Sequence, residues 1–138
     1  SLLCRLFDTD LAELAHNEDV GLLAFSPLAC GLLTGKYQAD TPPPQGSRKS
    51  ITSDLGGRIT PRLWPAIDAY ARIAAEFGID MTQMALAWTM QRPFMGSVIF
   101  GATTLDQLAT AIGSAELELS DDIMACIDAA HKDHPMPY

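Results

Sequence analysis

A chain of 138 residues with 48% hydrophobic content is long enough to form one globular domain with a buried core. Its formal net charge of −8 opposes association with phosphate backbones and anionic surfaces, so we expect neither a nucleic acid nor a membrane as a partner. The three cysteines show no metal-ligand spacing and are odd in number, which favours free thiols in a reducing compartment such as the cytoplasm, and no metal site.

The first part of the chain predicts a helix, a strand and a long loop. A helix is expected over residues 10–17, where Asp10 and Glu13 have the spacing of a capping box. Residues 20–25 are a continuous apolar run ended by a proline turn, which is typical of a parallel strand covered on both faces. Residues 38–62 show no periodicity and include three consecutive prolines, so this segment is predicted to be a lid or a binding loop.

The second part alternates helices with a short strand, which indicates a parallel sheet. Amphipathic spacing predicts a helix over residues 63–77, and residues 97–100 predict a short buried strand. Three more helices are expected after the capping residues Asp80, Thr104 and Ser120. Their inward faces are predicted to be Met81, Met84, Ala85 and Trp88 in the first, Leu105, Leu108 and Ile112 in the second, and Ile123, Cys126, Ile127 and Ala130 in the third.

Two strand-to-helix junctions rich in small residues are the clearest functional signal. The first covers residues 25–36 and ends in Lys36, and the second covers residues 98–104 and contains Gly101. Small residues let the backbone approach a large anion, so the pair predicts one nucleotide held from two sides. Residues 36–62 hold five basic and two acidic side chains, a net charge of +3 in an otherwise acidic chain.

Other interpretations of these motifs are weaker or stay open. Gly31 and Gly35 are one residue too close for a Walker A loop, and the Gly-x-Gly-x-x-Gly fingerprint of a Rossmann domain is absent. The turn at residues 103–104 could be no more than a helix cap, and Arg48 with its neighbour Lys49 could be solvated loop charges. His131 and His134, three positions apart, indicate a solvated helix end rather than a metal site.

Four motifs in order along the chain resemble the C-terminal part of the aldo-keto reductases: residues 25–28, 31–36, 84–88 and 101–108. Residues 26–31 and 46–48 look closest to the bacterial Tas-like reductases and the potassium-channel β subunits. The resemblance implies the C-terminal portion of a (β/α)₈ TIM barrel in a single segment, 1–138. It would hold about three parallel strands with covering helices and an extra C-terminal helix, with Leu2-Leu3 and residues 98–100 at the outer edges.

The resemblance also implies that the chain binds NADPH, with residues 38–62 as a cofactor-binding loop. Phe25 would stack on the nicotinamide, the segment from Ser26 to Cys30 with Lys36 would line the pyrophosphate, and Arg48 would reach the adenosine phosphate. The final junction would hold the 2′-phosphate and the adenine. The implied NADP-binding residues are Phe25, Ser26, Pro27, Leu28, Ala29, Cys30, Lys36, Arg48, Gly101, Thr103 and Gln107.

Two positions depart from the family pattern at the adenine end. Thr110 and Ala111 stand where the family often has an acid and an asparagine that grip the adenine, and many members have a basic residue in place of Gly101. We therefore expect weaker adenine binding, with the preference for NADPH over NADH resting largely on Arg48.

The family's catalytic Asp, Tyr, Lys and His lie on strands before the part that this sequence matches, so no catalytic residue is assigned. The chain is interpreted as a piece whose beginning has been cut away; the complete protein would reduce aldehydes or ketones, and the isolated chain would be inactive. Its exposed strands should pair with the missing N-terminal part or with a second copy. Two alternatives stay open: a non-catalytic nucleotide-sensing or interaction module, and a self-associating barrel remnant that no longer binds nucleotide.

Overall fold

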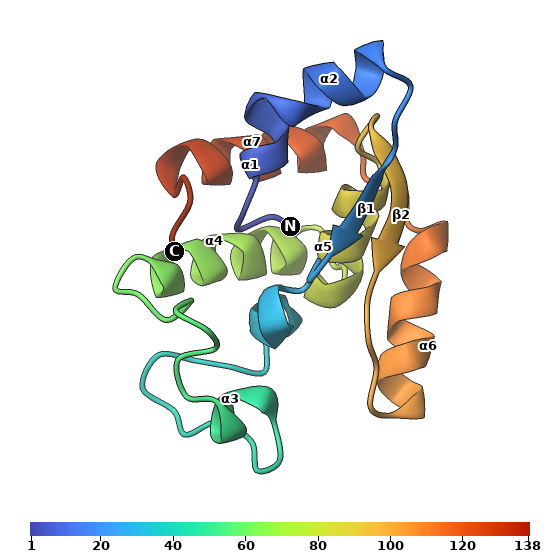
Figure 1. The fold of residues 1–138 in the computed structure, drawn as a ribbon. Helices are drawn as coiled ribbons and strands as arrows, with labels where there is room; N and C mark the ends of the chain where they lie inside the picture. Colours follow the sequence, from blue (N-terminus) through green and yellow to red (C-terminus); the bar gives the residue numbers. More distant parts are fainter.

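Two parallel strands, β1 (Leu22–Phe25) and β2 (Met95–Ile99), form the sheet of this chain. The computed structural model describes residues 1–138 and pairs Leu23 with Ser97 and Phe25 with Ile99. In Figure 1 the strands run side by side, with α5 (Met81–Met90) behind them and α6 (Leu105–Gly113) extending below the end of β2. The predicted α/β class with a parallel sheet is confirmed, and the carboxyl ends of both strands meet at one edge.

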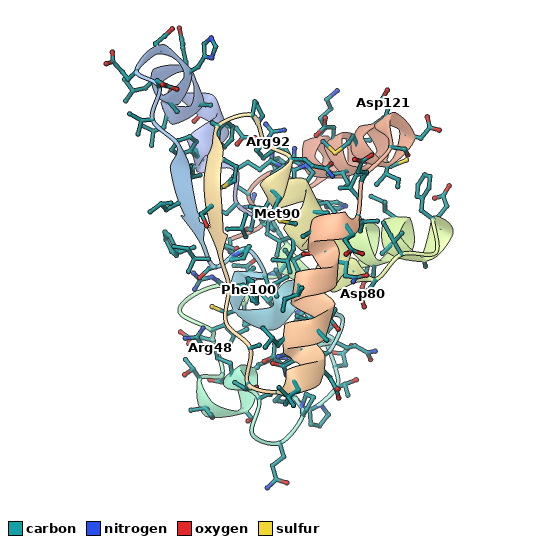
Figure 2. The ribbon with its side chains drawn as sticks, turned by 90° about the vertical axis from the view of Figure 1, so that its right-hand side faces the viewer. Arg48, Asp80, Met90, Arg92, Phe100 and Asp121 are labelled. Atoms are coloured by element: carbon teal, nitrogen blue, oxygen red, sulfur yellow. The ribbon has the colours of Figure 1, made fainter.

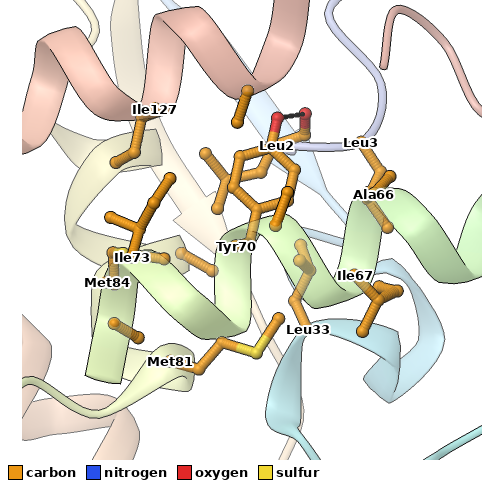
Figure 3. Packing of buried hydrophobic residues seen from close by; sticks show 14 of the residues in the cluster. Leu2, Leu3, Leu33, Ala66, Ile67, Tyr70, Ile73, Met81, Met84 and Ile127 are labelled. Atoms are coloured by element: carbon orange, nitrogen blue, oxygen red, sulfur yellow. Dashed lines mark hydrogen bonds between the residues drawn. The ribbon is translucent and has the colours of Figure 1, made fainter. Parts of the chain in front are cut away.

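The sheet has two strands, where about three were expected. Leu2 and Leu3 form no edge strand; they lie in a turn and are 0% and 1% exposed. Tyr70 of helix α4 (Leu63–Glu76) donates a hydrogen bond from its hydroxyl to the carbonyl oxygen of Leu2 at 3.0 Å (Figure 3). Burial against α4 therefore places this segment in the core instead of in the sheet.

Only one face of the sheet is covered by this chain. Ala24 of β1 is buried, whereas Leu23 is 61% exposed and Phe25 is 77% exposed. In β2, Ile99 is 51% exposed. The expectations of a first strand covered on both faces and of a buried second strand were wrong, because α5 packs against one side, whereas Leu23, Phe25 and Ile99 on the other side stay largely exposed.

The chain contains every helix that the sequence predicts. The short helices α1 (Leu6–Thr9) and α3 (Arg48–Ile51) were not predicted, and α3 lies inside the otherwise irregular segment 38–62. The remaining elements are α2 (Leu11–Asn17), the 3-10 helix η1 (Ala29–Thr34), the 3-10 helix η2 (Ser114–Glu116) and α7 (Asp121–Asp133). None of the helices has the length and apolar character needed to cross a membrane.

Three of the four predicted caps are present. The side chains of Asp80, Thr104 and Ser120 accept hydrogen bonds from backbone N–H groups three residues further on, at 3.0, 3.2 and 3.4 Å. Asp10 makes no such bond, because its backbone (φ −125°, ψ −44°) lies between the consecutive helices α1 and α2 instead of in the extended region that a cap prefers. The predicted capping box at Asp10 is therefore wrong.

The core lies where α4, α5 and α7 meet, on the side of the sheet that α5 covers. Met81, Met84 and Trp88 of α5 are buried as predicted, and Ile123 and Ile127 of α7 reach the same cluster. Figure 3 shows side chains from α4 and α7 converging with Leu33 of the first junction. This core fixes the turn that follows β1, because Leu32 and Leu33 are fully buried within it.

Helix α6 has the opposite orientation from the one expected. Its apolar face, predicted to point inward, is exposed: Leu105 by 81%, Leu108 by 38% and Ile112 by 61%. The helix packs on α5 through Ala111, and Ser114 that follows it is also buried. Small side chains let α6 approach α5 closely, and the larger apolar side chains face away.

Candidate functional site

The first junction is a tight turn with an unusual backbone. Immediately after β1, Ser26, Ala29 and Cys30 have positive φ angles of 52°, 48° and 59°. Side-chain-bearing residues rarely adopt this region, and such strain persists where the surrounding packing holds it, often at ligand-binding turns. Pro27 and Ala29 are buried, so these two predicted site residues support the turn from beneath.

Gly31 completes this turn and lies directly under Lys36. Its φ is 90°, and a Cβ atom at this position would lie 2.8 Å from Cε and 3.0 Å from Nζ of Lys36. Glycine is therefore favoured here by both its conformation and the space that the lysine occupies. The ammonium group therefore lies beside Gly31, in the junction that the sequence predicted to face an anion.

The second junction combines a helix cap with open space. Gln107 of α6 uses its Oε1 atom to accept hydrogen bonds from the backbone N–H of Thr103 at 3.0 Å and from the Thr103 hydroxyl at 3.1 Å. No atom lies within 4 Å of a Cβ built on Gly101. The turn at residues 103–104 therefore does cap α6, as the sequence allowed. The space beside Gly101 is open to a ligand.

One cleft of about 340 Å³ joins the two junctions at the carboxyl ends of the strands. Ligands commonly bind at this edge of parallel sheets and barrels, in pockets of this size class. Figure 2 shows this side of the molecule, with Phe100 at the end of β2 and Asp80 beside α6. The cleft is lined by Leu28, Gly31, Thr34, Lys36, Asp80, Thr82, Phe100, Gly101, Asp106, Gln107, Thr110 and Ala111.

Four of the predicted cofactor residues, Leu28, Lys36, Gly101 and Gln107, line this cleft. Sequence reasoning missed two acids in it: Asp80, which caps α5, and Asp106 in the first turn of α6. Their positions could have been inferred from the capping motifs. Asp80 is itself a cap and Asp106 follows the cap Thr104, so both acids lie at helix starts near the same edge of the sheet. The charged side chains that line the cleft are thus two carboxylates, Asp80 and Asp106, and one ammonium group, Lys36.

Phe25 and Ser26 lie elsewhere. Both line a separate, mostly apolar cavity of about 400 Å³ on the exposed side of β1, together with side chains from α1 and α2. Strand alternation explains this separation, because Phe25 is on the same face as the exposed Leu23. Cys30 is partly buried beside the turn, and Thr103 is exposed at the start of α6; neither lines the cleft.

Arg48 reaches the first junction from the long loop. It is the first residue of α3, and its Nη1 atom lies 3.7 Å from the Sγ atom of Cys30. The adjacent Lys49 instead places its Nζ atom 4.8 Å from the ring centre of Trp64. The two neighbouring cations thus have different surroundings: Arg48 is exposed at the junction, and Lys49 lies over an aromatic ring.

The ionisable groups whose pKa is moved by the fold lie away from the cleft. Burial raises the pKa of Tyr70 in α4 and of Tyr138 near the end of the chain, and burial lowers the pKa of His131 in α7. No group of three His, Cys, Asp or Glu side chains has the arrangement that a metal ion needs.

Residues 1–132 match the sequence model of the aldo/keto reductase family. The chain belongs to this family. It is 44% identical over 137 residues to Protein tas of Escherichia coli K12, a match that covers 99% of this chain and 39% of that protein. It is 34% identical over 129 residues to a putative voltage-gated potassium channel subunit beta of Schizosaccharomyces pombe, covering 88% of this chain and 37% of the relative.

The fold agrees with that of a solved family structure. The chain superposes on the glycerol dehydrogenase AKR11B4 from Gluconobacter oxydans with a TM-score of 0.76 at 22% identity, covering 98% of this chain and 41% of the other. At this identity the likeness concerns the fold alone, and it confirms the predicted portion of a (β/α)₈ barrel. The aldo/keto reductase chain described here thus spans only about two fifths of the length of these relatives.

Proposed function

We propose that this aldo/keto reductase chain binds NADPH across the cleft between its two strand-to-helix junctions. The single observation that carries the proposal is that one cavity of about 340 Å³ is lined by Lys36 with Gly31 on one side and by Gln107 with Gly101 on the other. Two junctions that are far apart in sequence face the same space, as a ligand held from two sides requires.

The residues present fit a dinucleotide. The space over Gly101 and the positive φ of Gly31 provide a surface without side chains for the pyrophosphate, and Lys36 supplies a cation beside it. Arg48, exposed at the first junction, is suited to pair with the adenosine phosphate, because a guanidinium can form two parallel charge-assisted hydrogen bonds to a phosphate. Residues 38–62 then act as a cofactor-binding loop within a single segment, 1–138.

Phe25 fits the nicotinamide end. Its ring is 77% exposed beside the apolar cavity next to β1, so a flat ring can stack on it. When bound, the nicotinamide of NADPH supplies a hydride for the reduction of a carbonyl group. In the whole protein, we propose that this reduces aldehydes or ketones to alcohols; the residues described here hold and orient the cofactor and include no assigned proton donor. The three free cysteines favour a cytoplasmic location.

A second candidate function is that of a nucleotide-sensing or interaction module. It is favoured by the 34% identity to a protein described as a putative voltage-gated potassium channel subunit beta. The cofactor site would be the same in both cases. They differ in whether the complete protein reduces carbonyl substrates, so a carbonyl reduction assay on the whole protein distinguishes them. In a third case, a self-associating barrel remnant, nucleotide binding would be lost.

Fluorescence titration with NADPH and NADH tests the proposal directly. We expect saturable binding of NADPH with an affinity higher than that of NADH, because only NADPH has the adenosine 2′-phosphate with which Arg48 can pair. A competition with NADP tests whether both oxidation states share the site. Absence of binding at millimolar cofactor would support the remnant instead, and equal affinities for NADPH and NADH would contradict the role given to Arg48.

A further inference from the structure

We infer that Tyr37 is a positioning residue that fastens the cofactor loop, residues 38–62, to the first junction and thereby holds Arg48 at the cleft. The inference rests on the proposed function for its effect on the cofactor. The fastening itself follows from contacts that involve no ligand.

The geometry is that of a buried ring with one polar anchor. Tyr37 directly follows Lys36 and is 3% exposed, with its ring inside the hydrophobic core. Its hydroxyl accepts a hydrogen bond from the backbone N–H of Lys49 at 3.1 Å. Because Lys49 follows Arg48 in α3, this bond fixes the peptide unit that joins the two residues. The loop leaves the core at Tyr37 and is attached to it again 12 residues later.

The half of the loop that carries Arg48 has few contacts outside the loop besides the Tyr37 bond: Arg48 Nη1 lies 3.7 Å from Cys30 Sγ, and Lys49 Nζ lies 4.8 Å from the ring centre of Trp64. A helix of four residues has no stability of its own, and an irregular loop gains entropy when it detaches. The backbone–backbone hydrogen bonds around α3, such as Ser47 N–H to Pro44 and Ser50 N–H to Ser47, stay inside the loop. Leu55, which is 2% exposed, holds the later half of the loop by apolar burial. Tyr37 holds the earlier half.

The same ring also orders the cations on both sides of the loop entry. The Nζ atom of Lys36 lies 5.2 Å from the ring centre of Tyr37, and that of Lys49 lies 5.9 Å from it. Cations within about 6 Å of an aromatic ring are attracted to its face. Tyr37 is therefore connected to the lysine that lines the cleft and to the helix that carries Arg48, which makes it a shared support for both proposed phosphate contacts.

The test compares Tyr37→Phe with the matched variant Tyr70→Phe. Both remove one hydroxyl from a fully buried tyrosine, but the hydroxyl of Tyr70 donates to Leu2 and has no contact with the loop. Limited trypsin digestion without cofactor reports loop release, since trypsin cleaves after Arg48 and Lys49. We expect the cleavage rate after these two residues to rise about threefold to tenfold in Tyr37→Phe, because losing one hydrogen bond raises the population of the detached loop by about this factor. In Tyr70→Phe the rate should stay near that of the unmodified chain.

The second readout is the ratio of the NADPH and NADH affinities. This ratio should fall in Tyr37→Phe toward the value of Arg48→Ala, and it should be unchanged in Tyr70→Phe. Circular dichroism melts of both variants show whether they are folded. Unchanged cleavage in Tyr37→Phe would overturn the anchor. Faster cleavage with an unchanged ratio would leave Tyr37 with no positioning role. If the unmodified chain binds neither cofactor, the proposed function fails, while the digestion still decides whether Tyr37 fastens the loop.

Discussion

The Nη1 atom of Arg48 lies 3.7 Å from the Sγ atom of Cys30, although the two residues are 18 positions apart. This contact brings the positively charged loop back to the turn that follows β1. Cys30 itself has a positive φ of 59°, so the loop arginine contacts one of the residues with an uncommon backbone conformation in the first junction. Arg48, although it comes from the long loop, therefore lies at the surface of the first junction.

The preference for NADPH is expected to depend on Arg48. Replacing it by Ala (R48A) should weaken NADPH binding by about 1.5–3 kcal/mol, the range for hydrogen bonds to a charged group, and leave NADH binding nearly unchanged. Lys49→Ala is the matched control: it removes the neighbouring cation, whose Nζ atom lies over Trp64, and should have a smaller effect. Parallel titrations measure both affinities. Equal losses in the two variants would indicate general charge attraction only.

A side chain at Gly31 is expected to displace Lys36. Gly31→Ala places a Cβ 2.8 Å from Cε of Lys36, whereas Gly35→Ala meets no atom within 4 Å; both positions have positive φ. Each change should lower the free energy of unfolding by about 1–2 kcal/mol through backbone strain. Only Gly31→Ala should also weaken NADPH binding. Thermal melts and titrations of the two variants measure these effects, and a similar loss of affinity in both would argue against a role for Lys36.

The acid at the start of α6 is expected to weaken binding of an anionic ligand. Asp106 lines the cleft, so Asp106→Asn should raise NADPH affinity about twofold to fivefold, the modest gain from removing an exposed like charge. Asp121→Asn is the control, because Asp121 also lies in the first turn of a helix but not at the cleft. Titration at low and at high salt measures the difference, which should shrink as salt screens the charges. A lower affinity in Asp106→Asn would mean that this carboxylate binds the ligand.

The isolated chain is expected to show no NADPH-dependent reduction of aldehydes or ketones above background. Hydride transfer without a positioned proton donor and an oxyanion partner lacks two of the largest catalytic contributions. Absorbance of NADPH in the presence of simple carbonyl substrates measures the rate. Turnover by rigorously purified chain that is proportional to its concentration would show that the residues described here include a proton donor.

The isolated chain is also expected to self-associate. Leu23, Phe25 and Ile99 are exposed by 61%, 77% and 51% on one face of the sheet, and β1 and β2 each have one edge without a neighbouring strand. Apolar strands with unpaired edges are templates for pairing with another chain. Light scattering over a concentration series measures the mass. A monodisperse species of 14.9 kDa at high concentration would contradict this expectation.

The sequence alone was sufficient for the family, the α/β class and most helices. Local signals dominate in these elements: the Asp80 side chain accepts the backbone N–H of Gln83 within three residues, and the amphipathic spacing in α4 extends over the whole helix. The two junctions line one cleft, because the carboxyl ends of neighbouring parallel strands share an edge, whereas the ligand that the sequence predicted between them stays a prediction. Four of the cofactor residues predicted from motifs line that space.

Tertiary packing decided what local patterns cannot specify, namely which apolar side chains find a partner. Leu2 and Leu3 look like strand residues but are buried against α4, whereas Leu105 and Ile112 look like core residues but are exposed, because α6 approaches α5 through small side chains. The contact of Tyr37 with the loop likewise spans residues with no local periodicity. Hydrophobic burial is non-directional and depends on neighbours distant in sequence, so it can only be read from the folded chain.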